Sequence, residues 1–168
     1  AGWPWERYGP AVMAAVRAGV PVLGGNLPRA EMGAAMRDAS LEQRLPLAEL
    51  QAQQAQIRDG HCGLLPEAQV PGMVRIQLAR DLAMARTLAE ATDGGRQVLL
   101  LAGGQHVRRD RGVPAHLPPA LAARTQAVLM VAGGDSARAE GVDLAWPTPA
   151  VPPKDHCAGL RERLRPGS

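Results

Sequence analysis

Four short apolar runs, separated by longer stretches with helical character, constrain the fold of this chain more than any other feature. They cover residues 20–24, 97–102, 127–132 and 142–146. Apolar runs of this length are typical of strands that are buried in a sheet. Because helical connections between such strands favour parallel pairing, we expect an α/β fold with one mostly parallel sheet flanked by helices.

The strongest helical pattern covers residues 72–92. Its apolar side chains recur on one face at helical spacing, namely at Val74, Leu78, Leu82, Ala85 and Ala89. Asp81 lies at the edge of this face, where a buried carboxylate requires a partner. The neighbouring Arg80 cannot face it, so we expect a partner from elsewhere in the fold.

The remaining helical patterns are shorter. Helices are predicted over 5–18, 29–38 and 41–59, and the segment 107–122 is predicted to be half helical. All these elements form one domain over residues 1–148, followed by a Pro-rich, charged tail over 149–168. The chain starts without an initiator Met or a leader pattern. We therefore expect it to be the C-terminal portion of a domain whose N-terminal part is missing.

Composition excludes some classes of protein. The net charge of +3 comes almost entirely from arginine, because Lys154 is the single lysine. No basic run is interleaved with aromatic residues, so we expect no nucleic-acid partner. The sequence also lacks an apolar stretch of about 18 residues, which a transmembrane helix requires.

The most informative local pattern follows the apolar run 97–102, where Gly103-Gly104-Gln105-His106 comes next. The glycines allow a tight turn and the close approach of a ligand. A histidine just past the end of a strand is well placed as a metal ligand, a haem-iron ligand or a general base. A histidine that caps the following helix would give the same spacing, so the spacing leaves both roles open.

Six segments of the chain, taken in order, resemble one known family. They are Gly-Trp-Pro-Trp-Glu-Arg-Tyr-Gly at 2–9, Val-Pro-Val-Leu-Gly-Gly-Asn-Leu-Pro-Arg at 20–29, Ile-Arg-Asp-Gly-His-Cys-Gly at 57–63, Met-Val-Arg-Ile-Gln-Leu-Ala-Arg-Asp-Leu-Ala-Met-Ala at 73–85, Ala-Gly-Gly-Gln-His-Val-Arg-Arg-Asp-Arg-Gly-Val-Pro at 102–114 and Asp-His-Cys at 155–157. Together they resemble the ChaN-like haem-binding uptake family, which is related to the Tiki and erythromycin-esterase group. The resemblance spans nearly the whole chain.

This resemblance implies an α/β fold, haem as the cofactor, a role in haem and iron uptake, and often a lipoprotein anchor. It thus implies a membrane-associated protein, periplasmic or at the outer membrane, with haem and the outer-membrane uptake machinery as partners. A homodimer is a further expectation.

The chain departs from the family in one respect. Family members usually carry an N-terminal half with a Gly-Glu-x-His-type motif and a later acidic residue, and neither is present here. Only the second pattern, Gly103 to His106, is found. A metal-dependent hydrolase of the Tiki or erythromycin-esterase type, with His106 as metal ligand or base, is the alternative function. No set of Glu and Asp at ligand spacing supports it.

Two groups of residues are candidates for the haem site. Tyr8 could supply a phenolate to the haem iron, with Trp3 and Trp5 stacking on the porphyrin, or this segment could simply pack on the core. His106 is the other candidate for the iron.

Further candidates could line the site. Met73, with Gln77, Arg80 and Met84, forms a stripe that could face a pocket, although such stripes more often belong to the core. Arg108, Arg109 and Arg111 could pair with haem propionates, and a solvated arginine face is the alternative.

Cys62 and Cys157 are the only cysteines, and they form no metal-ligand pattern. Two unrelated thiols are one interpretation. Each cysteine follows a histidine in a short polar segment, and the family resemblance implies an extracytoplasmic protein, where a disulfide persists. We therefore predict that the two cysteines lie close together and form a disulfide.

Overall fold

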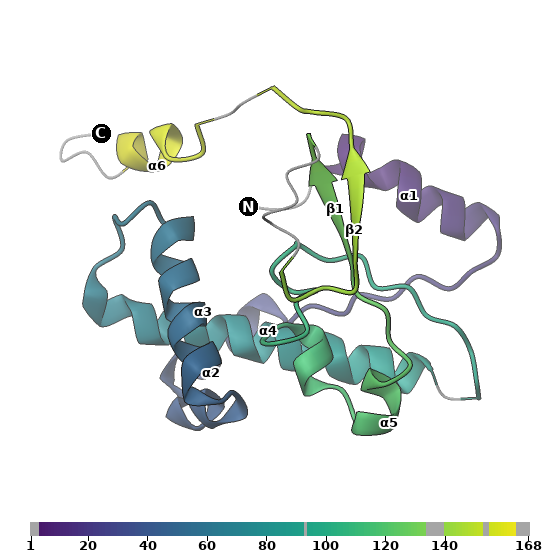
Figure 1. Cartoon of the computed structure of the whole chain (residues 1–168), viewed down its shortest axis with the longest axis horizontal. Helices are drawn as coiled ribbons and strands as arrows, with labels where there is room; N and C mark the ends of the chain where they lie inside the picture. Colours follow the sequence, from purple (N-terminus) through teal and green to yellow (C-terminus); the bar gives the residue numbers. More distant parts are fainter. Residues whose placement is uncertain (1–3, 93, 134–139, 153–154, 164–168) are drawn as a thin grey trace.

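The computed structural model describes residues 4–92, 94–133, 140–152 and 155–163. Its α-helices are α1 (Trp5–Arg17), α2 (Met32–Arg37), α3 (Leu47–Gly60), α4 (Val70–Ala91), α5 (Pro119–Ala122) and α6 (Ala158–Arg163). The strands are β1 (Val128–Ala132) and β2 (Leu144–Thr148). Short 3₁₀ helices cover η1 (Arg29–Glu31), η2 (Ala39–Arg44), η3 (Glu67–Gln69) and η4 (Val113–His116). In Figure 1, α4 runs across the lower half of the molecule and α1 lies at the top, beside the strands.

Helix α4 confirms the prediction made for 72–92. Pro71 stands in its first turn, where a missing N–H costs nothing. The side chains of Val70, Val74 and Leu78 are almost fully buried. At the other end, the Thr92 hydroxyl donates a hydrogen bond to the carbonyl of Ala89. The helix is thus held by burial of one face over its whole length.

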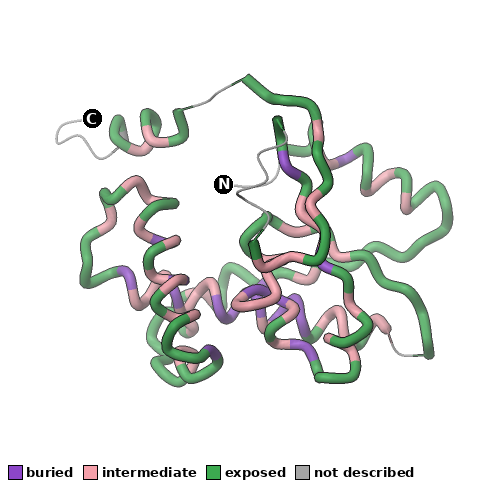
Figure 2. Tube along the Cα trace, in the orientation of Figure 1, coloured by how far each residue is buried: buried purple, intermediate pink, exposed green. Residues whose placement is uncertain are grey.

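Three clusters of buried residues form the core, and α4 contributes to each. The first contains Leu45, Ile57, Val70, Val74 and Leu78; the second Met84, Ala85, Val113 and Leu117; the third Leu27, Ala79 and Ala83. Figure 2 shows that the buried positions concentrate along α4 and the segments against it. The core is therefore built around one helix rather than around a sheet.

The sheet is smaller than the sequence predicts. β1 and β2 pair in parallel, with Val128 opposite Leu144. This pairing confirms the predicted strands at 127–132 and 142–146. The expectation of helices on the faces of a large sheet is not met among the described residues, where the sheet has two strands.

The predictions of strands at 20–24 and 97–102 are wrong. Both segments are extended or irregular and lack strand pairing. Leu100 and Ala102 pack against the second cluster, but Leu99 and Leu23 are exposed. Apolar composition favours burial of a run, whereas a strand also needs a hydrogen-bonded neighbour. In the part of the chain that is described, neither run has one.

The shorter predicted helices are found at the expected positions in the sequence, but several of them are divided into two shorter helices. The segment 5–18 forms α1. The predicted helix 41–59 is split into η2 and α3, because Pro46 occupies the position before α3. The segment 29–38 is divided between η1 and α2, and 107–122 contains η4 and α5.

The predicted disulfide between Cys62 and Cys157 is confirmed. The two Cα atoms are 5.8 Å apart, inside the range that a disulfide requires. Cys62 follows α3 in a turn and has a φ of 60°. The bond therefore ties the segment before α6 to the end of α3, across 95 residues of sequence.

We expect the double variant Cys62→Ser/Cys157→Ser to lose up to roughly 4 to 5 kcal/mol of unfolding free energy, because the disulfide closes a long loop in the unfolded chain. Urea denaturation with and without a reductant measures the effect. The reductant should lower the stability of the parent and leave the double variant unchanged. Two free thiols in unreduced, denatured parent protein would contradict the prediction.

Candidate functional site

His106 and Asp81 form a buried pair at the centre of the chain. His106 Nδ1 lies 2.5 Å from Asp81 Oδ1. The side chain of Asp81 is 1% exposed and that of His106 is 12% exposed. Asp81 therefore has the distant partner that its position on α4 requires.

The turn that carries His106 is fixed by its backbone. The His106 N–H donates to the carbonyl of Gly103, and the Val113 N–H donates to the carbonyl of His106, each at 2.8 Å. A Cβ on Gly112 would lie 2.4 Å from the His106 carbonyl oxygen, so only glycine fits there. Val113 is buried in the second core cluster. The backbone of His106 is thus fixed by one hydrogen bond to a residue before it and one from a residue after it.

The environment of Asp81 sets the state of the pair. Burial raises the pKa of Asp81 above its usual range, although the hydrogen bond with His106 and the charge of Arg80 oppose this rise. When Asp81 is ionised, it accepts the Nδ1–H of His106, which leaves the ring lone pair on Nε2. Nε2 is the atom that could then bind a metal or accept a proton.

Gln77 completes the cluster. It stands one turn before Asp81 on α4, and its amide nitrogen lies 3.0 Å from His106 Nδ1 and 3.4 Å from Nε2. The sequence singled out all three residues separately but did not predict that they meet. The available signal was the spacing of four between Gln77 and Asp81, which places both on one helix face.

The predicted arginines are held within the chain. Arg108 donates two hydrogen bonds to the carboxylate of Asp110, at 3.0 and 2.8 Å, and Arg111 donates a third at 2.7 Å. Burial alone would raise the pKa of Asp110, but these arginines lower it. Arg109 lies 3.2 Å from Asp143. Arg108 and Arg111 are 16% and 13% exposed, so they do not form a solvated face.

The aromatic candidates lie on α1. The Trp5 side chain is 60% exposed, and its ring covers Gly9, where a Cβ would come within 2.7 Å. Tyr8 is half-buried. Trp3 lies outside the described residues. Trp5 and Tyr8 are three residues apart and so share one side of the helix.

Met73 lies elsewhere, beside the first core cluster. Its half-buried side chain packs against this cluster. Met84, from the same predicted stripe, is buried in the second cluster. Both thioethers thus contribute to core packing.

Two further observations concern metals and membranes. Among the described residues, no group of three or more His, Cys, Asp or Glu side chains is arranged to hold a metal ion. The hydrolase alternative thus gains no supporting observation. A search of the described helices for one long and apolar enough to cross a membrane found none.

Comparison with known proteins gives one match. A family model described as haem-binding uptake, Tiki superfamily, ChaN, matches residues 1–117. The match covers the aromatic segment of α1, helix α4 and the turn of His106, and ends before Cys157. Neither a curated protein nor a solved structure matches the chain.

The raised pKa of Asp81 gives a testable dependence of stability on pH. The folded chain holds this proton more tightly than the unfolded chain, whose Asp titrates near about pH 3.9. The stabilisation from Asp81 is complete below that pH and is lost as the pH rises through the folded pKa. We therefore expect Asp81→Asn to gain stability relative to the parent as the pH rises from about 4 towards the folded pKa of Asp81, by at most about 1.4 kcal/mol per pH unit.

Urea denaturation of both proteins across this range measures the difference. Asp59→Asn is the matched control, because Asp59 is an exposed aspartate on α3. A difference between Asp81→Asn and the parent that stays constant with pH would contradict the prediction.

Proposed function

The chain belongs to the haem-binding uptake family of the Tiki superfamily typified by ChaN, and on this premise we propose that it binds haem and takes part in haem uptake. The observation of its own structure that carries this proposal is the His106–Asp81 pair. A histidine oriented by a carboxylate is a common arrangement for a ligand to iron or another metal.

The donor set at His106 fits a haem iron. When Asp81 is ionised, it accepts the Nδ1–H and fixes the ring orientation, so that Nε2 would carry the lone pair. Bound haem would supply the iron centre that the imidazole ligates. Gln77 lies close to Nε2, and its amide would have to move aside when the iron binds.

Tyr8 and Trp5 support a second possible position for the haem, on α1. A tyrosine phenolate is an axial ligand that proteins use for haem iron. The exposed indole of Trp5 offers an apolar ring on which a porphyrin can stack. Tyr8 is thus the alternative iron ligand, with Trp5 beside it on α1.

The roles proposed for Arg108 and Met73 require more rearrangement. Arg108 pairs with Asp110, so a haem propionate would have to replace or share that carboxylate. Met73 packs against the core and could contact haem only through its half-buried surface. We retain both as secondary contacts of the haem site.

We place the protein in the periplasm or at the outer membrane. The disulfide between Cys62 and Cys157 supports this proposal, because such bonds persist in oxidising compartments. The family supports a lipoprotein anchor in the full-length form and delivery of haem to or from an uptake machinery.

The haem proposal is tested by titrating haem into the oxidised chain and following the Soret band. We expect binding, and we expect His106→Ala or Tyr8→Phe to shift the band or to weaken binding by about tenfold or more, as loss of an iron-ligand interaction does. His156→Ala is the matched control, because His156 is exposed and lies outside the site. If neither substitution changes the spectrum or the affinity, the site assignment is wrong.

A homodimer is supported by the segment 97–102. Val98, Leu99 and Leu101 are exposed, Leu99 by 82%. No backbone hydrogen bond is found for these residues within the described chain. An extended apolar segment with unpaired backbone groups is a template for pairing with another strand, and we propose that a second copy of this chain supplies it.

Sedimentation equilibrium tests whether the chain forms this homodimer. We expect a mass of twice 17.7 kDa for the parent and a monomer for Leu99→Glu, because a charge would be buried at the contact. Leu47→Glu is the control, since Leu47 is similarly exposed, at 70%, but lies on α3. A monomeric parent at all concentrations would contradict the proposal.

A further inference from the structure

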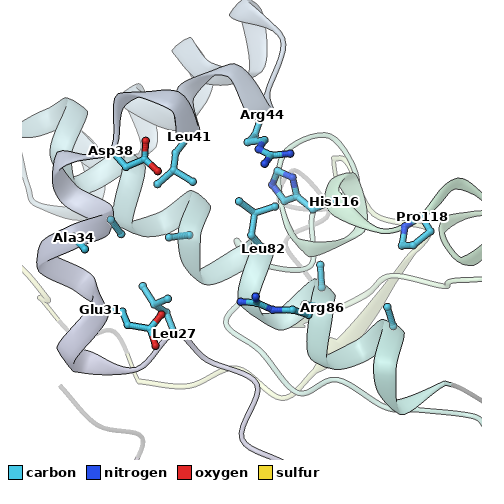
Figure 3. Close-up of a pocket in the computed structure, with 14 residues that line it drawn as sticks. Leu27, Glu31, Ala34, Asp38, Leu41, Arg44, Leu82, Arg86, His116 and Pro118 are labelled. Carbon is cyan, nitrogen blue, oxygen red and sulfur yellow. The ribbon is translucent and has the colours of Figure 1, made fainter.

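A cavity of 720 Å³ lies on the side of α4 that faces α2 and η4. Residues of η1, α2 and η2 form one wall, and residues of η4 and the segment after it form the other (Figure 3). The volume falls in the range of small-molecule sites in proteins. None of the haem-site candidates discussed above lines this cavity.

The floor of the cavity is apolar and aliphatic. It is formed by leucines and alanines, among them Leu27, Ala34, Leu41, Leu82 and Ala89. Figure 3 shows the side chains of Leu41, from η2, and Leu82, from α4, turned toward each other. No Phe, Tyr or Trp lines the cavity. The floor therefore suits an aliphatic chain better than a flat ring that stacks on aromatic side chains.

The charged groups of the cavity surround its apolar side chains. In Figure 3, Arg44 and His116 lie together at one end, whereas Arg86 lies below Leu82 and extends toward Glu31. Asp38 is engaged by the backbone N–H and the hydroxyl of Ser40. The end with Arg44 and His116 is thus the part of the cavity that favours a negative charge.

The two arginines that line the cavity are exposed and lie on either side of Leu82. Among the described residues, no ion pair or hydrogen bond is found for Arg44 or Arg86. By contrast, Arg58, Arg75, Arg108, Arg109, Arg111 and Arg161 all pair with acidic side chains. Guanidinium groups beside an apolar surface are well suited to a carboxylate.

His116 adds a second sign of an incomplete site. Its Nε2 is buried and has no hydrogen-bond partner among the described residues. Burial and the charge of Arg44 lower the pKa of His116, which indicates a positive potential at this end. A buried polar atom without a partner is costly; because Nε2 is closed off from solvent, only a rotation of the ring would bring it to a ligand.

We propose that this cavity binds an amphipathic carboxylate, with an aliphatic chain along Leu41 and Leu82 and its carboxylate at the end that holds Arg44 and His116. Fatty acids have this chemistry, and the propionate-bearing edge of a porphyrin shares part of it. The aliphatic floor favours the fatty acid. This site is separate from the proposed haem function and does not depend on it.

The test is calorimetric titration of dodecanoate into the oxidised chain, with 1-dodecanol as the uncharged analogue. We expect dodecanoate to bind one to one, and dodecanol to bind roughly tenfold more weakly because it forms no charge-assisted hydrogen bonds. Arg44→Ala should weaken dodecanoate binding by roughly tenfold. Arg17→Ala is the matched control, since Arg17 is exposed on α1, far along the sequence from the cavity.

A second variant and a competitor make the result specific. Ala34→Trp should occlude the cavity and abolish dodecanoate binding, because Ala34 is an exposed lining residue whose enlargement does not disturb the core. Iron-free protoporphyrin that displaced dodecanoate would identify a porphyrin as the occupant, and no displacement would identify the fatty acid. No dodecanoate binding, equal binding of dodecanol, or unchanged affinity in the Arg44→Ala variant would each overturn the proposal. The Soret titration reads the haem function separately.

Discussion

The burial of helix α4 is the constraint on which the rest of the structure depends. All three core clusters use its side chains, and α2, α3, η2 and η4 pack against it. The contact with α2 is close at Gly72 of α4, where a Cβ would lie 2.8 Å from the Met36 side chain, and Gly25 lies against Met84. Because the sheet has two strands among the described residues, it cannot organise the core, and the helix does so instead.

Through the Asp81–His106 pair, the candidate site also depends on the burial of helix α4. A carboxylate with 1% exposure is costly unless it is bonded. His106 provides the bond, and its turn is anchored through Val113 to the second core cluster. The position of the imidazole is therefore set by the packing of α4 and not by the exposed segment 97–102 that precedes it. This explains how a candidate ligand can be rigid although the run leading to it is not part of a sheet.

The sequence predicted what depends on local periodicity and missed what depends on distant neighbours. Helix α4 followed from its apolar repeat, and the need of Asp81 for a partner followed from its place in that repeat. The identity of the partner could not be predicted, because His106 is 25 residues away. The runs 20–24 and 97–102 look like strands by composition, but pairing is a property of their neighbours. The disulfide was predicted with the help of the family resemblance, since spacing alone does not choose between a bond and two thiols.

The two proposed sites lie on different faces of the same helix. With 3.6 residues per turn, Gln77 and Asp81 share one face of α4, whereas Leu82, Arg86 and Ala89 lie roughly a quarter to a half of a turn away, and Ala85 lies at the boundary between the two faces. The first face meets His106 and the second lines the cavity. A flat ligand held through His106 Nε2 would have to cross α4 to fill the cavity. The geometry therefore favours two ligands of different chemistry, one bound through an iron atom and one through a carboxylate, both positioned by the burial of a single helix.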